Sequence, residues 1–264
     1  MAPKLEITGL GKTYVTEDGE SIVALEDLNF EVGEGEFVSI VGPSGCGKST
    51  LFDILAGFKE PTTGSVRIDG TEPEGLIGRV SYMQQRDMLL PWRTVLDNTI
   101  LALEISGVKR RQARKIAREQ LPRFGLAGFE ELLPEQLSDG MRQRAALLRT
   151  YLAGREILLL DEPFAALDAM TRQQVREWML EIWEADRKTI VLITHDIEEA
   201  VFLADRALGM SRRPGNIAVS VDVDLPRPRA IETLEDPHLV ELRKQLRASL
   251  GDSVPDAGAG KAAG

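Results

Sequence analysis

The sequence predicts an α/β fold built around a largely parallel sheet. Three short apolar, β-rich runs, at 37–41, 157–160 and 189–194, are typical of buried parallel strands. An amphipathic helix at 171–186 lies between the last two runs, and this strand–helix–strand order implies that the two strands are parallel. Of the 264 residues, 43% are hydrophobic and 28% are charged. A chain of this composition can bury a core, which excludes wholesale disorder.

The first eighty residues are predicted to form short strands separated by turns. Partial alternation of apolar and polar residues indicates strands at 5–8 and 24–30, and a further short strand is expected at 65–68. Residues 50–57 have the spacing of a helix, and Gly57 is a suitable residue to end it. The 37–41 strand, which ends in glycines, leads into this helix.

From about residue 95 to residue 150 the pattern is helical. A polar, arginine-rich helix is expected at 109–120 and a second helix at 137–152, with Ser138 as its N-cap. The arginine-rich helix is interpreted as a solvent-exposed face. The segment 212–215, Arg-Arg-Pro-Gly, carries no chemistry that the sequence assigns. The last residues, 251–264, are small or polar and are expected to be disordered.

Charge and composition narrow the function. There are 32 Lys+Arg and 42 Asp+Glu, for a net charge of -10, which argues against nucleic acid as a partner. No apolar stretch is long enough to cross a bilayer, and the start of the chain does not resemble a secretory signal. A single cysteine fits a reducing cytoplasm. Residues 81–160 are the positive block, with 13 basic and 9 acidic side chains.

A glycine-rich segment follows the 37–41 strand and opens the helix after it. It fits G-x-x-x-x-G-K-S/T at every fixed position, in the structural context that this phosphate-binding loop requires. Its backbone N–H groups and the following helix N-terminus favour an anion. Lys48 is expected to reach the β- and γ-phosphates and the Ser49 hydroxyl to coordinate Mg²⁺. Cys46 is interpreted as a small space-filling side chain. The predicted nucleotide-binding residues here are Gly42, Pro43, Ser44, Gly45, Cys46, Gly47, Lys48, Ser49 and Thr50.

Two acids end the strand at 157–160. Asp161 is placed to hold Mg²⁺, and Glu162 is placed to polarise an attacking water. His195 follows the 189–194 strand. A lone histidine at a strand end is more often structural, but this one emerges at the carboxyl edge of the sheet, where α/β proteins bind ligands.

The segment 137–144, Leu-Ser-Asp-Gly-Met-Arg-Gln-Arg, lies between the phosphate loop and these acids. It resembles the signature motif of the ATP-binding cassette (ABC) family, with Asp139 where the family usually has glycine. The other family motifs follow in order: Tyr14 resembles the A-loop aromatic that stacks on adenine, Gln85 the Q-loop glutamine, Asp168 the D-loop and His195 the H-loop. Gln84 is an alternative for the Q-loop role. The resemblance covers about residues 4–225.

This resemblance implies a P-loop NTPase (RecA-like) core with an N-terminal antiparallel β-subdomain and an inserted helical subdomain at about 87–152. It places a single ATPase domain at 1–240, followed by a C-terminal helix and disordered tail at 241–264. It also implies that two subunits pair head to tail and enclose two ATP molecules. The simplest pair is a homodimer, because the chain has one phosphate loop and one signature motif.

The resemblance assigns the site residues as well. It implies catalytic roles for Glu162, His195 and Gln85, and Mg²⁺ ligation by Ser49, Gln85 and Asp161. Tyr14, Ser138, Gly140 and Asp168 join the nucleotide-binding set, of which Ser138 and Gly140 serve the nucleotide of the opposite subunit. Asp139 is expected to point away from the phosphates, because a carboxylate beside them would repel them.

The segments 89–98, 161–172 and 195–200 look like those of importer ATPases for nitrate, taurine and other sulfonates. The same group contains members that serve bicarbonate, thiamine precursors and aromatic acids, so the resemblance narrows the solute class only loosely. This resemblance implies a second ATPase copy and transmembrane permease subunits as direct partners, and an extracytoplasmic solute-binding protein as an indirect one. The chain is expected on the cytoplasmic face of the inner membrane, with its positive block toward the permease. Two alternatives are a soluble ABC ATPase without a transport role and a small-molecule kinase, although a kinase does not explain 137–140.

Overall fold

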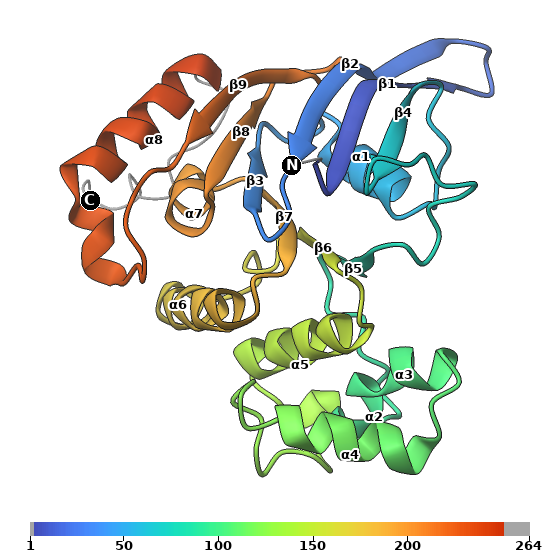
Figure 1. The fold of residues 1–264 in the computed structure, drawn as a ribbon, viewed down its shortest axis with the longest axis vertical. Helices are drawn as coiled ribbons and strands as arrows, with labels where there is room; N and C mark the ends of the chain where they lie inside the picture. Colours follow the sequence, from blue (N-terminus) through green and yellow to red (C-terminus); the bar gives the residue numbers. More distant parts are fainter. Residues whose placement is uncertain (1–2, 251–264) are drawn as a thin grey trace.

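The computed structural model describes residues 3–250, which form two β-sheets and the helices that cover them (Figure 1). The smaller sheet has the order β2-β1-β4 and is antiparallel throughout. Its strands are β1 (Leu5–Val15), β2 (Ser21–Val32) and β4 (Thr63–Ile68). This sheet is the antiparallel N-terminal part that the sequence analysis expected.

The larger sheet has six strands in the order β5-β6-β7-β3-β8-β9. They are β3 (Phe37–Val41), β5 (Ser81–Met83), β6 (Ile157–Asp161), β7 (Thr189–Thr194), β8 (Arg206–Met210) and β9 (Ile217–Asp222). All neighbouring pairs are parallel except β8 with β9. Every residue of β3, β6 and β7 is buried, which confirms the strands predicted from the apolar runs.

The six-stranded sheet separates two hydrophobic cores, as β3 shows. Phe37 and Val41 pack into the core that contains the inserted helices and the C-terminal helices. Val38 and Ile40 pack into the other core, which is shared with the smaller sheet and α1. Successive side chains of a strand point to opposite faces. A strand that is covered on both faces therefore needs the continuous apolar run seen here.

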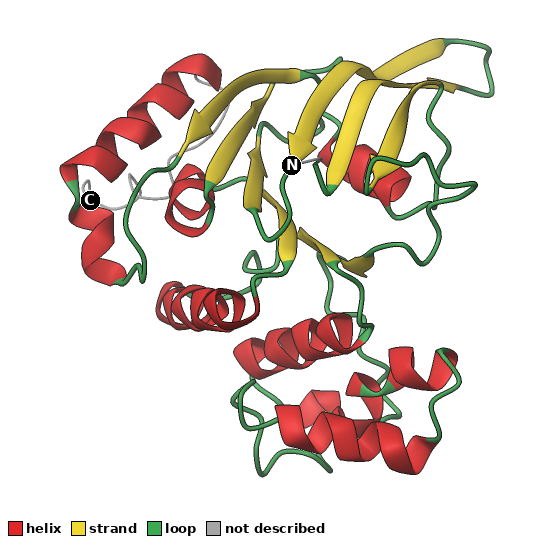
Figure 2. Ribbon diagram, viewed as in Figure 1, coloured by secondary structure: helices red, strands yellow, loops and turns green. Residues whose placement is uncertain are grey.

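The helices fall into two groups (Figure 2). Those that pack on the sheets are α1 (Lys48–Leu55), α6 (Ala169–Asp186), α7 (Ile197–Leu203) and α8 (Pro237–Leu250). Those inserted between β5 and β6 are α2 (Val95–Thr99), α3 (Leu101–Ile105), α4 (Arg110–Gln120) and α5 (Asp139–Leu152). The inserted helices gather at the end of the molecule opposite the smaller sheet (Figure 1). The α/β core with an inserted helical part is thus confirmed.

Several helix boundaries agree closely with the sequence. Ser138 is the N-cap of α5, and its Oγ accepts a hydrogen bond of 3.3 Å from the Met141 N–H. Gly57, with φ of 80°, follows the C-cap of α1. The expected disorder of 251–264 concerns positions outside the described residues. Within residues 3–250, no helix has both the length and the apolar character needed to cross a membrane.

Candidate nucleotide-binding site

The phosphate loop joins β3 to α1, and its conformation depends on glycine. Gly45 and Gly47 have φ of 77° and 110°, a region that side-chain-bearing residues avoid. A Cβ at Gly47 would lie 2.6 Å from Leu25 Cδ2 and 2.9 Å from the Ala24 carbonyl oxygen. Because β2 packs this closely against the loop, the loop has no room for a side chain at Gly47. The turn delivers Lys48 as the first residue of α1.

The Lys48 ammonium is held on the inner side of this loop. Its Nζ donates to the carbonyl oxygens of Gly42 at 2.7 Å and Pro43 at 3.1 Å, and the residue is 7% exposed. Cys46 is 1% exposed and belongs to the adjacent core, in agreement with a space-filling role. The loop therefore fixes a positive charge at the N-terminus of a helix, which is the arrangement that binds phosphate.

A pocket of about 460 Å³ opens over the loop. Tyr14 from β1 forms part of its wall, and the Tyr14 Oη donates to Thr50 Oγ1 at 3.4 Å. The Tyr14 ring offers an aromatic face of the kind that stacks on a base. The lining residues are Tyr14, Ile22, Ala24, Ser44, Gly45, Gly47, Lys48, Ser49, Thr50, Glu162 and Arg213.

Asp161 ends β6 as a buried carboxylate, only 7% exposed. Burial raises its pKa to about 6, although a hydrogen bond of 3.2 Å from the Tyr82 Oη acts in the opposite direction. A buried carboxylate is stabilised in its charged form by a nearby cation. Asp161 and the predicted ligands Ser49 and Gln85 offer carboxylate, hydroxyl and amide oxygens, the donors that Mg²⁺ takes, with phosphate and water completing its shell. The donor set therefore fits Mg²⁺.

Three predicted catalytic side chains meet at one oxygen atom. Gln85 Nε2 donates to Glu162 Oε2 at 2.9 Å, and His195 Nδ1 lies 3.4 Å from the same oxygen. They come from the segment after β5, the end of β6 and the end of β7. Because Gln85 makes this contact, it is favoured over Gln84 for the Q-loop role.

The Glu162 carboxylate is kept ionised by this arrangement. The contact with His195 lowers the pKa of Glu162, and the same contact raises the pKa of His195. Glu162 itself has φ of 45°, a conformation unusual for a residue with a side chain. Its Oε2 therefore combines the two requirements of a general base, namely charge at neutral pH and a position on the wall of the pocket.

The remaining predicted residues form a separate group. Gly140 is buried against α6, and a Cβ there would lie 2.6 Å from Thr171 Cγ2. Asp168 caps α6 by accepting hydrogen bonds of 3.1 Å from the N–H groups of Met170 and Thr171. Neither these residues nor the exposed Ser138 line the phosphate pocket. Within the described chain, Ser138, Gly140 and Asp168 therefore do not join the group of residues around the phosphate pocket.

Asp139 starts α5 and forms an ion pair with Arg142 one turn along the helix. Its side chain is 59% exposed. We therefore expect Asp139→Gly to change the rate of ATP hydrolysis less than about tenfold, since its charge is matched locally and screened by solvent. Steady-state phosphate release by the purified protein measures this. An increase well beyond tenfold would mean that Asp139 restrains the site.

Arg213 was not predicted from the sequence. It lies in the connection between β8 and β9, and its Nε and Nη2 each lie 3.3 Å from the Gly45 carbonyl oxygen. Gly215, two residues later, donates its N–H to the Ala24 carbonyl at 3.0 Å. This connection, which is remote from the phosphate loop in the sequence, therefore contributes Arg213 to the wall of the phosphate pocket. In the sequence, Arg213 appears only as a basic residue before a Pro-Gly turn. That pattern does not indicate what the residue binds.

Comparison with known proteins agrees with this geometry. The family model described as ABC transporter matches residues 25–165. An uncharacterised ABC transporter ATP-binding protein of Methanocaldococcus jannaschii is 42% identical, over 96% of this chain and 94% of that protein. A taurine import ATP-binding protein of Rhizobium johnstonii is 42% identical, over 90% and 92%. A solved dimeric ATP-binding cassette in a post-hydrolysis state with ADP and Pi is 32% identical. It has a TM-score of 0.72 and covers 84% of this chain and 100% of its own.

Proposed function

The chain belongs to the ABC transporter family, and from this membership we propose that it powers an importer for a small anionic solute. It is an ABC ATPase, the ATP-binding subunit of a transporter, and it hydrolyses ATP. The observation that carries the proposed mechanism is the meeting of Gln85 and His195 on Glu162 Oε2 beside the phosphate pocket. The proposed location is the cytoplasmic face of the cell membrane, where the chain would act as a peripheral subunit.

The site residues divide the work of hydrolysis. Tyr14 stacks on the adenine, and the backbone of the phosphate loop with Lys48 binds the phosphates. Glu162 accepts the proton of the attacking water, while His195 and Gln85 orient the carboxylate and the γ-phosphate. Ser49, Gln85 and Asp161 would hold Mg²⁺, which supplies charge neutralisation at the β- and γ-phosphate oxygens.

A second copy of the chain completes each site. Ser138 and Gly140 do not line the phosphate pocket, and on this proposal they serve a nucleotide held by the other subunit. A two-fold pair satisfies both subunits at once. The similar solved cassette is dimeric in its ADP-bound, post-hydrolysis state, which supports this arrangement. Asp168 lies at the start of α6, near Gly140, where it can contact the partner.

The proposed permease contact is the loop before α2, where Trp92 is 74% exposed. The side chain of buried Asn98 holds this loop in place through hydrogen bonds. Its Nδ2 donates to the carbonyls of Leu90, Arg93 and Thr94 at 2.9–3.1 Å, and its Oδ1 accepts from the Leu90 N–H at 2.7 Å. A rigid loop that exposes a large aromatic side chain has the character of an interface anchor.

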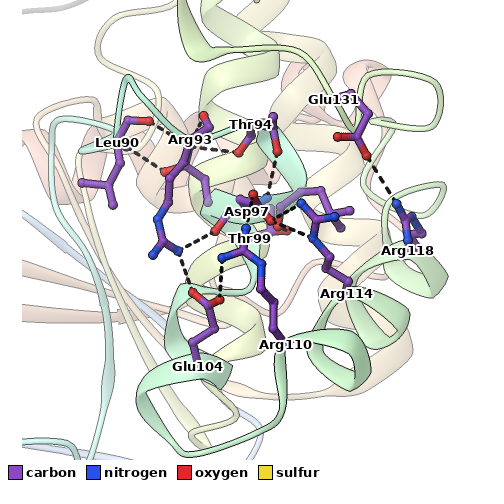
Figure 3. A network of polar contacts seen from close by, with 12 residues as sticks. Leu90, Arg93, Thr94, Asp97, Thr99, Glu104, Arg110, Arg114, Arg118 and Glu131 are labelled. Atoms are coloured by element: carbon purple, nitrogen blue, oxygen red, sulfur yellow. Dashed lines mark hydrogen bonds and ion pairs between the residues drawn. The ribbon is translucent and has the colours of Figure 1, made fainter.

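Three basic side chains near this loop form ion pairs within residues 81–160. Arg110 and Arg114 lie beside the 85–98 segment, where both are paired with Asp97 at 2.5–2.7 Å (Figure 3). Arg93 is likewise paired with Glu104 at 2.6 Å. These three arginines are therefore held by two carboxylates of the same block. The proposed docking surface rests on the shape of the loop and on Trp92.

We expect Trp92→Ala to reduce transport at least about tenfold while basal ATP hydrolysis changes less than about twofold. Loss of a central aromatic anchor typically costs an interface 2 kcal/mol or more, but Trp92 does not line the nucleotide pocket. Solute uptake into vesicles with the reconstituted complex, compared with hydrolysis by the isolated subunit, measures the split.

Val15→Ala is the matched control, because Val15 is similarly exposed, at 72%, but lies on the smaller sheet. Equal losses of transport and basal hydrolysis in Trp92→Ala would contradict the docking assignment.

The proposed solute class rests on the nitrate-, taurine- and sulfonate-type motifs and on the taurine-import relative. Thermal-shift screening of the cognate solute-binding protein against taurine, other sulfonates, nitrate and neutral solutes tests it. Stabilisation by neutral solutes alone would reject the anionic class. Stimulation of ATP hydrolysis by the co-purified permease tests the transport role. If the protein hydrolyses ATP but the permease does not stimulate it, the alternative of a soluble ABC ATPase without a transport role is favoured.

A further inference from the structure

A buried ion-pair cluster lies between α6 and the segment that carries His195. Arg176 on α6 donates from Nη2 to Glu199 Oε1 at 2.6 Å and to Asp196 Oδ2 at 3.1 Å, and from Nε to Glu199 Oε1 at 3.2 Å. The three side chains are only 6–7% exposed. A guanidinium that reaches two carboxylates at once fixes both in direction as well as distance.

Both chain neighbours of His195 are held by this cluster. Thr194 Oγ1 donates to Glu199 Oε2 at 2.6 Å and accepts from the Asp196 N–H at 3.0 Å. Asp196 also caps α7, because its Oδ1 accepts from the N–H groups of Glu198 at 2.8 Å and Glu199 at 3.3 Å. The backbone is thus anchored on each side of His195.

The His195 side chain itself has little packing to hold it. It is 49% exposed, and its 3.4 Å contact with Glu162 Oε2 is longer than a well-formed hydrogen bond. The direction of the imidazole therefore depends on the backbone that carries it. That backbone depends in turn on the cluster, whose cation comes from α6, the helix capped by Asp168.

We propose that Arg176 is a positioning residue for ATP hydrolysis, which acts through Asp196 and Glu199 to hold His195 against Glu162. Burial alone would not explain an ion pair here, because buried ion pairs contribute little net stability compared with apolar packing. The proposal rests on the role proposed above for His195. It adds that α6 sets the geometry of the hydrolytic centre, although no residue of α6 lines the nucleotide pocket.

The kinetic test uses Arg176→Lys, which keeps the buried positive charge but lacks the planar fork that reaches both carboxylates. We expect kcat to fall about 10- to 100-fold, the effect of misplacing a reacting group by about 1 Å. The KM for MgATP should change less than about twofold. In a His195→Ala background, Arg176→Lys should have no further effect, because residues that act through one group are not additive.

A second readout is spectroscopic. The chain has two histidines, His195 and His238, so imidazole NMR signals can be assigned by the loss of one set in His195→Ala. In Arg176→Lys the His195 signals should shift or broaden, while those of His238 remain. A purely structural role predicts unchanged His195 signals in folded protein.

If Arg176→Lys does not fold, Arg176→Met combined with Glu199→Gln removes the cation together with one carboxylate and serves in its place. Arg123→Met is the matched control, since Arg123 pairs with Asp186 at 2.7 Å at the C-terminal end of α6 and should leave kcat unchanged within about twofold. Full activity of the folded Arg176 variant, or a further loss in the His195→Ala background, would overturn the proposal. Full activity of His195→Ala alone would instead overturn the role proposed for His195.

Discussion

Glu162→Gln is expected to lower ATP hydrolysis by about 10²- to 10⁴-fold while ATP binding is retained. Glutamine has nearly the shape of glutamate and keeps an oxygen for the contacts with Gln85 and His195, but its amide cannot accept the proton of water. ATP therefore stays intact between the two subunits. Gel filtration with MgATP should show a persistent dimer, and phosphate release should be almost abolished.

The matched control is Glu156→Gln. Glu156 comes directly before β6, and Glu162 comes directly after it. The Glu156 side chain is 75% exposed and pairs with Lys4, at the opposite end of the strand from Glu162. Hydrolysis by Glu156→Gln should stay within about twofold of the unchanged protein. A Glu162→Gln protein that binds ATP yet remains a monomer would contradict the paired arrangement. One that hydrolyses ATP within tenfold of the normal rate would contradict the role of Glu162 as base.

Lys48→Ala should weaken ATP binding by about 100-fold or more. The ammonium is positioned by the Gly42 and Pro43 carbonyls, and each hydrogen bond from it to a charged phosphate contributes about 1.5–3 kcal/mol. Titration calorimetry with ATP measures the change in Kd. The loss should be larger for ATP than for AMP, which lacks the β- and γ-phosphates that Lys48 is expected to reach.

Lys115→Ala is a suitable control, because this lysine is 80% exposed on α4 and does not line the phosphate pocket. Its Kd for ATP should not change. If a folded Lys48→Ala protein bound ATP with unchanged affinity, the proposed contact between Lys48 and the phosphates would be wrong.

The sequence predicted those strands and helices whose own residue pattern is enough to identify them. Strands β3, β6 and β7 are buried on both faces, so each appears as an apolar run. Strand β5 has only three residues, and its pairing with β6 (Ser81 with Leu158, Met83 with Leu160) is a tertiary fact that no short window contains. The start of α1 at Lys48, rather than Thr50, follows from the left-handed Gly47 that caps it.

The candidate site was predictable as a set of residues but not as a set of contacts. The order of the motifs gave Gln85, Glu162 and His195, and only the strand order β5-β6-β7 explains why they meet. Arg213 and Arg176 were missed for a different reason. Each is an arginine without a motif of its own, and its importance lies in partners that the fold brings to it.

Helices α2–α5 are inserted between two adjacent parallel strands, β5 and β6. The inserted segment can therefore be exchanged as a module. Parallel neighbours such as β5 and β6 must be joined by a crossover, and one helix is enough for that purpose. Here residues 84–156 occupy the crossover, while the β5–β6 ladder fixes both junctions. A chimera that receives this segment from a relative would therefore take the proposed permease loop, Gln85 and the Ser138–Gly140 segment from the donor. It would keep its own phosphate loop, Glu162 and His195. Its graft points would be set by backbone pairing and not by sequence likeness.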